Sequence, residues 1–190
     1  MNIDSFIKTI GKESKPSLDI KIEIDFEIFE DKEKAFLHSL KNVAVEGVVV
    51  KKAKIEEKIK ELSKDYKNIA SIYPFSIRTL NSNDIKDPKE LNNVDLSIVK
   101  GKFGVCENGA VWIEEEENIH RAIYSICKHL LILLDRDSLV STMHEAYERI
   151  DPSLSYGIFI SGPSKTADIE QSLVIGAHGA KFVTVFLIDE

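Results

Sequence analysis

The chain has 190 residues, of which 43% are hydrophobic and 30% are charged, and its net charge is −7 at neutral pH. This composition argues against a disordered chain, because enough apolar surface is present for a core that offsets the conformational entropy lost on folding. The negative charge argues against nucleic acid as the main partner. We expect one domain over residues 1–190, decorated at its N-terminus by residues 1–30.

The first half of the chain predicts strands and helices in alternation. Between residues 20 and 28, isoleucine and phenylalanine alternate with charged residues, which is typical of a half-exposed edge strand. Residues 36–40 and 55–62 carry apolar side chains at helical spacing. Residues 43–50 and 69–75 predict further strands, and the first of these lacks alternation, so we expect it to be the more buried.

An irregular stretch separates this part from the rest of the chain. Residues 81–93 are rich in Asn, Asp, Lys and Pro, which predicts a loop. Residues 94–113 predict two strands that bend at glycines.

The second half predicts a clean alternation of helices and strands. We expect helices over residues 120–128, 138–150 and 165–175, and strands over residues 130–134, 157–161 and 182–188. Apolar strands without alternation, each followed by a helix, indicate an α/β fold with a largely parallel sheet and helices on both faces. We expect the strands 130–134 and 157–161 to be adjacent and parallel.

Targeting signals and metal motifs are missing from the sequence. The N-terminus lacks the pattern of a signal peptide, and the longest apolar runs are shorter than the roughly 20 residues that cross a bilayer. Cys106 and Cys127 lack the spacing of a zinc or iron–sulfur site, and no pair of histidines has ligand spacing. We therefore expect a cytoplasmic protein without membrane insertion, metal or cofactor of its own, and we expect Trp112 and Tyr124 to be core aromatics.

The segment Ser161-Gly162-Pro163-Ser164-Lys165-Thr166-Ala167-Asp168-Ile169-Glu170 follows an apolar strand and precedes a predicted helix. A helix N-terminus beyond a strand offers unpaired N–H groups and a positive dipole, which suit an anion such as a carboxylate or phosphate. Gly162 permits a close backbone approach, and Ser164, Lys165 and Thr166 supply donors. The alternative is that Ser164 or Thr166 only caps the helix. The segment lacks the Lys-Ser/Thr pair of a phosphate-binding P-loop, which excludes nucleotide hydrolysis.

Glu107 is a second candidate. It stands beside Asn108-Gly109, a pair that favours a tight turn, so its carboxylate would be presented at a corner. A carboxylate in that place can act as a nucleophile or base, and the alternative is a solvated hairpin residue. His178, between two glycine-containing dipeptides, is a third candidate for ligand binding.

These motifs resemble a known family. The segment from Ser161 to Glu170, followed by Gly176-Ala177-His178-Gly179, resembles the C-terminal signature of the LutC and YkgG family, which is defined by the LUD domain. Residues 94–112 are similar to the preceding block of that family. The resemblance covers roughly the C-terminal half of the chain, and the N-terminal half resembles the family only in its strand–helix rhythm.

The resemblance implies both a fold and a role. It implies the fold of the NagB, RpiA and CoA-transferase-like superfamily, and a subunit or accessory role in the oxidation of L-lactate to pyruvate beside iron–sulfur partner proteins. The chain differs from the family pattern in Asn108-Gly109-Ala110, where many members have Thr-Gly-Thr, and in Ala180, where proline is usual.

A second resemblance concerns the same turn. Cys106-Glu107-Asn108-Gly109 is similar to the Ser-Glu-Asn-Gly motif around the nucleophilic glutamate of CoA transferases. It implies an alternative in which Glu107 attacks an acyl-CoA. We also expect Glu107 and the turn at residues 162–166 to face one shared cleft, because both follow strands that end in glycine-containing turns.

Overall fold

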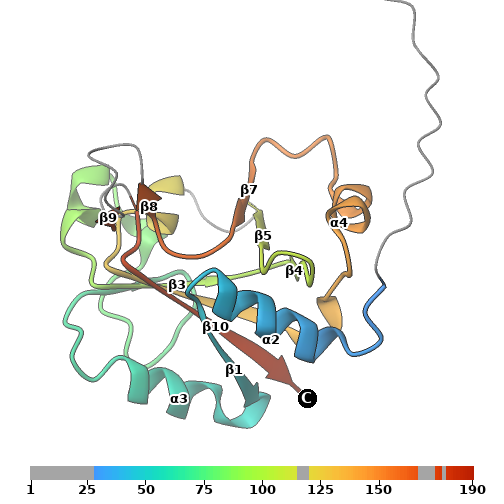
Figure 1. The fold of residues 1–190 in the computed structure, drawn as a ribbon. Coiled ribbons are helices and arrows are strands. Elements are labelled where there is room, and N and C mark those ends of the chain that lie inside the picture. The colour runs from blue at the N-terminus through green and yellow to red at the C-terminus, as the bar shows by residue number, and fades with distance from the viewer. Residues whose placement is uncertain (1–27, 115–119, 167–173, 177–178) are drawn as a thin grey trace, which may run out of the picture.

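The structure is a computed structural model that describes residues 28–114, 120–166, 174–176 and 179–190 (Figure 1). Residues 20–27 of the predicted strand 20–28, and most of the predicted N-terminal decoration, lie outside these residues. Within the described part of the chain, no helix is long and apolar enough to cross a membrane.

A five-stranded sheet forms the centre of the fold. Its strand order is β1-β10-β6-β3-β2, and all four neighbouring pairs are parallel. The strands are β1 (Glu46–Lys51), β10 (Phe182–Asp189), β6 (His129–Asp135), β3 (Leu96–Lys100) and β2 (Ile69–Ser71). The sheet confirms the predicted α/β class with a mostly parallel sheet.

Two helices, α2 (Lys32–Asn42) and α3 (Ile55–Leu62), cover opposite faces of this sheet (Figure 1). Leu130 of β6 packs in one core cluster with Phe36 of α2. The next residue, Leu131, packs in a different cluster with Ile59 of α3. Because successive side chains of a strand point to opposite faces, the two helices lie on opposite sides, as the sequence predicted.

A second sheet shares the α2 face. It contains β4 (Phe103–Gly104), β5 (Val111–Glu114) and β7 (Gly157–Ile160), all antiparallel. Val111 and Ile113 of β5 belong to the core cluster of α2. The other side of this sheet is covered by α4 (Met143–Arg149), whose Ala146 packs in a cluster with Trp112.

The prediction that the strand at 157–161 lies parallel to the strand at 130–134 is wrong. β7 pairs antiparallel with β5 in the second sheet. Phe159 of β7 pairs with Trp112 of β5, and the centroids of the two rings lie 4.6 Å apart. All four residues of β7 are half-buried, whereas the first six residues of β6 are buried. A short apolar run has the same pattern in a parallel core strand and in an aromatic-packed antiparallel strand, so the sequence did not separate the two.

Two predicted helices differ in the structure. In the segment 165–175, β8 (Lys165–Thr166) and β9 (Val174–Ile175) pair antiparallel, and residues 167–173 are outside the described part. The helix predicted over 120–128 is a 3-10 turn at Arg121–Tyr124 that ends before β6 begins. Both segments carry apolar residues at helical spacing. In the first, Lys165 pairs with Ile175 across two short strands. In the second, the local turn bonds end at Ile126, and the N–H of Lys128 donates to the carbonyl oxygen of Val94.

Smaller differences concern an edge strand, a long helix and a loop. β1, predicted to be buried, is the edge strand of the central sheet, and its Val49 is 40% exposed. The helix predicted over 138–150 is confirmed only in part, because a 3-10 turn at Arg136–Ser138 precedes the shorter α4. Residues 81–93, predicted as a loop, contain two 3-10 turns, Ser82–Asp84 and Pro88–Asn93.

Candidate functional site

A pocket of about 240 Å³ opens where the second sheet meets the amino ends of β6 and β10. Leu130 is the second residue of β6 and Val183 the second of β10, so the pocket lies at the amino end of the parallel strands. Side chains and backbone of β7 and of the turn after it form the opposite wall. The lining residues are Arg121, Tyr124, Ser125, Leu130, Tyr156, Ile158, Phe159, Ile160, Ser161, Gly162, Ser164, Gly179, Ala180 and Val183. We call this the Arg121 pocket.

The positive charge of the Arg121 pocket is held by an aromatic ring. The guanidinium carbon of Arg121 lies 4.3 Å from the ring centroid of Tyr156. Tyr124 stacks on Tyr156, with 6.4 Å between the ring centroids and 10° between the planes. A guanidinium above an aromatic face is attracted by the ring quadrupole. The stack therefore orients a planar cation at the pocket.

Two of the predicted anion-binding residues, Gly162 and Ser164, line this pocket. Gly162 has a φ of 89°, and a Cβ atom on it would lie 2.3 Å from the carbonyl oxygen of Val43 at the end of α2. No other residue fits this turn without strain. The N–H of Ser164 donates to the carbonyl oxygen of Ala180 at 3.0 Å, which ties the turn to the segment that leads into β10.

The helix on which the anion prediction relied does not begin at Lys165. Lys165 and Thr166 form the short strand β8, so no helix N-terminus begins there. The ammonium of Lys165 donates to the carbonyl oxygen of Val43 at 2.7 Å, and Lys165 does not line the pocket. Positive charge in the pocket comes from Arg121 instead. Asp168 and His178 lie outside the described residues.

Glu107 stands on a tight turn, as predicted. Gly109 has a φ of 67°, and the side-chain oxygen of Asn108 accepts the N–H of Ala110 at 3.0 Å. The Glu107 carboxylate is exposed and accepts the N–H of Met143, the first residue of α4, at 2.8 Å. It therefore supplies an acceptor for one of the unpaired N–H groups at the start of that helix.

The turn of Glu107 touches the turn of the pocket, but its carboxylate points elsewhere. Ser161 donates its hydroxyl to the carbonyl oxygen of Asn108 at 3.1 Å, so the two turns lie side by side. Glu107 is nevertheless absent from the lining of the Arg121 pocket. The structure brings together Gly162, Ser164 and Arg121, and it does not place Glu107 in the cleft that they form.

The sequence did not identify Arg121 and Tyr156, and it predicted the ligand site at the wrong end of the central sheet. The expected ligand end was the carboxyl end of the parallel strands, which is usual for open α/β sheets. The turn after residue 160 follows β7 of the second sheet and therefore lies at the amino end of the parallel strands. No spacing links Arg121 to Tyr156 in sequence. Trp112 and Tyr124 are buried, as predicted for core aromatics.

Both cysteines are buried and free. Burial raises the pKa of the Cys106 thiol to about 11 and also raises that of Cys127. Thiols with raised pKa values are poor nucleophiles at neutral pH, because the thiolate is the reactive form. In the described ranges, no group of three or more His, Cys, Asp or Glu side chains is arranged to hold a metal ion.

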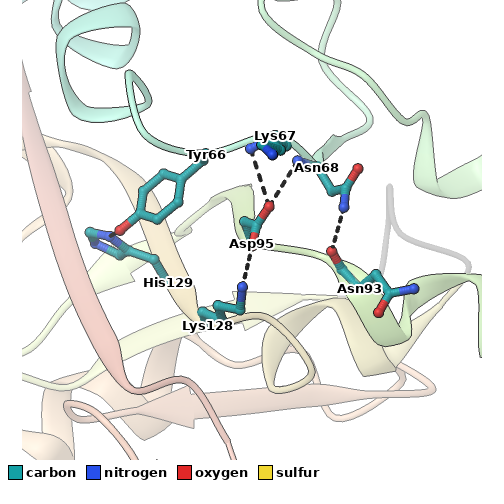
Figure 2. A network of polar contacts seen from close by, with 7 residues as sticks. All are labelled: Tyr66, Lys67, Asn68, Asn93, Asp95, Lys128 and His129. Carbon is teal, nitrogen blue, oxygen red and sulfur yellow. Dashed lines mark hydrogen bonds and ion pairs between the residues drawn. The ribbon is translucent and has the colours of Figure 1, made fainter.

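A polar network occupies the same amino edge, on the α3 face (Figure 2). His129 joins Tyr66 through Nδ1 at 2.9 Å and Thr184 through Nε2 at 2.9 Å. Beside it, the Asp95 carboxylate accepts the backbone N–H groups of residues 67 and 68 and pairs with the ammonium of Lys128. A cavity of about 260 Å³ adjoins His129.

Comparison with known proteins assigns the chain to a family. Residues 82–188 match the LUD domain family. The chain belongs to this family. All the residues that line the Arg121 pocket fall within the matched range, so the pocket is part of the LUD domain itself.

The similar proteins of known sequence include Lactate utilization protein C from Oceanobacillus iheyensis, which is 29% identical over 102 residues, 50% of this chain and 44% of that protein. Lactate utilization protein C from Bacillus subtilis is 25% identical over 109 residues, 54% of this chain and 45% of that protein. The alignments span less than half the length of these relatives. A crystal structure of a DUF162 family protein from Deinococcus radiodurans has a TM-score of 0.68 and 16% identity, and the match covers 83% of this chain and 96% of that chain. That protein shares the fold.

Proposed function

We propose that this LUD-domain protein acts in the cytoplasm in the use of L-lactate, by binding a small organic carboxylate in the Arg121 pocket. Its role is accessory to the oxidation of L-lactate to pyruvate, and iron–sulfur partner proteins carry the electrons. The names of the relatives support the metabolic context. The observation that carries the proposal is the guanidinium of Arg121, held over Tyr156 at a pocket of the LUD domain.

The chemistry of the pocket suits a short hydroxy or keto acid. A guanidinium binds a carboxylate through two parallel N–H···O bonds, which fixes its orientation as well as its charge. Ser161 and Ser164 line the same pocket, and the Ser161 hydroxyl, which donates to the carbonyl oxygen of Asn108, can still accept a hydrogen bond from a hydroxyl on the next carbon. Leu130 and Val183 supply apolar surface for a methyl group. Small-molecule sites commonly combine such an apolar wall with a few polar groups.

The lining of the pocket favours binding over proton transfer. Among the described residues that form it, none carries a carboxylate, a thiol or an imidazole. Oxidation of a hydroxy acid removes a proton from the hydroxyl group, and general bases for that step are most often His, Glu or Asp. An accessory subunit that holds or delivers the acid therefore agrees better with this lining than a free-standing dehydrogenase does.

The binding proposal is tested with L-lactate and pyruvate by titration calorimetry on the wild type and on Arg121→Gln. Loss of a charge-assisted hydrogen bond costs roughly 1.5–3 kcal/mol, so we expect the affinity to fall by about 10-fold to 100-fold. Arg149→Gln is the matched control, because its guanidinium is exposed and donates to Ser138 outside the pocket. Equal affinities in Arg121→Gln and the wild type would refute the proposed site.

The accessory role is tested separately. We expect a tagged chain purified from its native cells to retain iron–sulfur proteins, and deletion of the gene to slow growth on L-lactate as sole carbon source. A chain that purifies alone, and whose loss leaves lactate oxidation in extracts unchanged, contradicts the accessory role.

A second candidate is an enzyme related to CoA transferases in which Glu107 is the nucleophile. The exposed carboxylate at the Asn108-Gly109 turn favours it, because a nucleophile must reach its substrate. Attack of Glu107 on an acyl-CoA forms a mixed anhydride and releases the CoA thiolate. The thiolate then displaces the acyl carboxylate and leaves a glutamyl-CoA thioester. A protein mass increase after incubation with acetyl-CoA, absent in Glu107→Gln, is the expected signature of this alternative.

A further inference from the structure

We propose that the hydrogen-bonded chain Tyr66–His129–Thr184 is a pH-sensitive clasp that opens when His129 takes up a proton and thereby reshapes the Arg121 pocket. The inference rests on the proposed function only in treating that pocket as the ligand site. We call these three residues the clasp.

The clasp ties together three elements at the amino edge of the central sheet. His129 is the first residue of β6, Thr184 lies in β10, and Tyr66 precedes β2. In the strand order, β3 lies between β6 and β2, so the bond from His129 to Tyr66 reaches past one strand. Figure 2 shows the phenol of Tyr66 meeting the imidazole of His129 next to the Asp95 network.

The neutral imidazole suits the clasp, and the charged one does not. A neutral ring has one donor and one acceptor, and each hydroxyl partner takes the complementary role. His129 is 6% exposed, and its ring packs edge-on against Tyr66 and near the ring of Phe182, with centroid distances of 5.7 Å and 5.9 Å. Burial lowers the pKa of His129 below its usual value near 6.5. A proton on this ring adds a charge in an apolar site, where charge is poorly solvated.

A route to water lies beside the clasp. The adjoining cavity is lined by Tyr66, His129, Thr184, Phe182 and Glu46, together with Ala44 and Val183. Glu46 lines this cavity and is exposed, so the space beside His129 opens to water. Rotation of the charged ring into this space restores its hydration and breaks its bond to Tyr66 or Thr184.

Several other charged groups lie near the clasp. Lys128 precedes His129 and pairs with Asp95, and this bond together with the N–H groups of Asn68 and Lys67 lowers the pKa of Asp95. The Lys181 ammonium lies 5.6 Å from the Phe182 ring centroid. Burial, followed by the charges of Asp65 and Asp95, raises the pKa of Tyr66, so its phenol stays protonated. As the pH falls from neutrality, His129 is the clasp group that changes charge.

The clasp and the Arg121 pocket share a backbone. Leu130 follows His129 and Val183 precedes Thr184, and both line the pocket on the opposite face of the sheet. The carbonyl oxygen of Lys128 accepts the N–H groups of Lys181 and Phe182 at 2.9 Å and 3.1 Å. A shift in the first residues of β6 and β10 therefore moves two walls of the pocket directly.

The sign of the effect follows from the lowered pKa of His129. Above about pH 6.5, the pKa of histidine in the unfolded chain, the clasp is closed and its contribution to stability is fully present. That contribution is lost as the pH falls through the lower pKa that His129 has in the folded protein. We therefore expect the pocket to change below pH 6.5, and not above it.

The test follows the methyl signals of Leu130 and Val183 and the ring signal of His129 by NMR between about pH 8 and pH 5, a range that spans histidine ionisation. We expect the methyl signals and the ring to shift with one shared midpoint below 6.5. In Thr184→Val, which keeps the shape of the side chain but removes its hydrogen bond, we expect the ring to titrate and the methyl response to disappear.

Two variants identify the responsible histidine. His120 precedes Arg121, and its Nε2 lies 2.8 Å from the carbonyl oxygen of Ile85, so His120→Gln controls for a direct effect on the pocket. His178→Gln controls for the histidine next to Gly179. Both are expected to keep the full methyl response. Four outcomes would each overturn the clasp. The methyl response could be lost in either control, or it could be unchanged in Thr184→Val. The methyl signals of the wild type could stay constant while the ring titrates, or the protein could unfold before the ring titrates.

Titration with L-lactate separates the clasp from the proposed function. We expect L-lactate to bind the wild type about fivefold more weakly at the low-pH end of the range, and Thr184→Val to lose this dependence. If L-lactate does not bind at any pH while the methyl signals still respond, the clasp stands and the proposed ligand is wrong. If L-lactate binds with the same affinity throughout, the clasp does not control the site and the inference fails.

Discussion

The two faces of the central sheet are covered in different ways. On one face, α3 covers the core with its buried Ile59, and Tyr66, Phe75 and Ile77 from the segments beside β2 pack against the same cluster. On the other face, α2 covers one part and the antiparallel β4-β5-β7 sheet covers another. The Arg121 pocket lies beside the amino ends of the strands on this second face, where the turn after β7 meets the end of α2. The α3 face has a cavity of similar size at the same edge, beside His129, so the two faces differ in the groups that line their cavities and not in the space that they leave.

The largest expected effect comes from truncating two neighbouring leucines of β6 that point to opposite faces. Leu130 and Leu131 are both buried, and replacement of such a leucine by alanine costs about 3 kcal/mol of unfolding free energy. We expect both variants to lose that amount in urea unfolding. Only Leu130→Ala should also change the affinity for L-lactate, because only Leu130 lines the Arg121 pocket. Equal ligand affinities in the two variants would contradict the division of roles between the faces.

Gly157→Ala is expected to disturb the second sheet alone. A Cβ atom at this position would lie 2.0 Å and 2.3 Å from two ring carbons of Trp112. Overpacking of this kind costs about 2 kcal/mol, which thermal or urea unfolding would detect. In the double variant with Trp112→Phe, the smaller ring vacates that space, so the combined loss should be about 1 kcal/mol smaller than the sum of the single losses. Strict additivity would show that the clash is relieved elsewhere.

Two substitutions of Glu107, at the edge of the second sheet, separate a structural role of its carboxylate from a chemical one. Glu107→Ala removes the acceptor for the Met143 N–H at the start of α4, and loss of such a cap costs about 1 kcal/mol. Glu107→Gln keeps an oxygen acceptor, so its unfolding free energy should stay within about 0.5 kcal/mol of the wild type. Under the CoA-transferase alternative, Glu107→Gln nevertheless abolishes formation of the CoA adduct. Measurement of both properties in both variants separates a capping residue from a nucleophile.

The smallest expected effect is a gain in stability at the end of α2. Ala44 has a φ of 61°, and the bonds from Val45 to Leu40 and from Ala44 to Lys41 form the capping motif that usually carries glycine at this position. Ala44→Gly should stabilise the protein by about 0.5–1 kcal/mol, because relief of the left-handed strain exceeds the added freedom of the unfolded chain. Ala35→Gly inside α2 is the matched control and should destabilise by about 1 kcal/mol. A loss in both variants would show that Ala44 is not strained.

The inner strands of the central sheet were predictable from the sequence because they are buried on both faces. Continuous apolar runs such as residues 130–134 and 182–188 have few other places in a soluble fold, and the helices at α2 and α3 carry apolar side chains at the spacing that buries one face. The rhythm predicts parallel strands but not their order, since β6 pairs with β10 and not with the strand at 157–161 that was expected beside it.

The candidate site was predictable only in part. Gly162 and Ser164 were identified from their turn chemistry, which depends on local sequence. Arg121 was missed because its position depends on the stacking of Tyr156, and that contact exists only after the second sheet has formed. The helix expected at residue 165 was wrong for a related reason, since β8 is stabilised by pairing with β9 and not by its own periodicity.

The contact of Gly162 with Val43 limits where the chain can be truncated without loss of the fold. The family match begins at residue 82, whereas the turn that holds Gly162 rests on the end of α2, and Lys165 donates its hydrogen bond to the same carbonyl. A recombinant fragment cut at the family boundary would also leave β10 without its neighbour β1. The unit suitable for expression, transfer to another protein or fragment screening therefore begins before α2, well upstream of the segment that sequence similarity outlines.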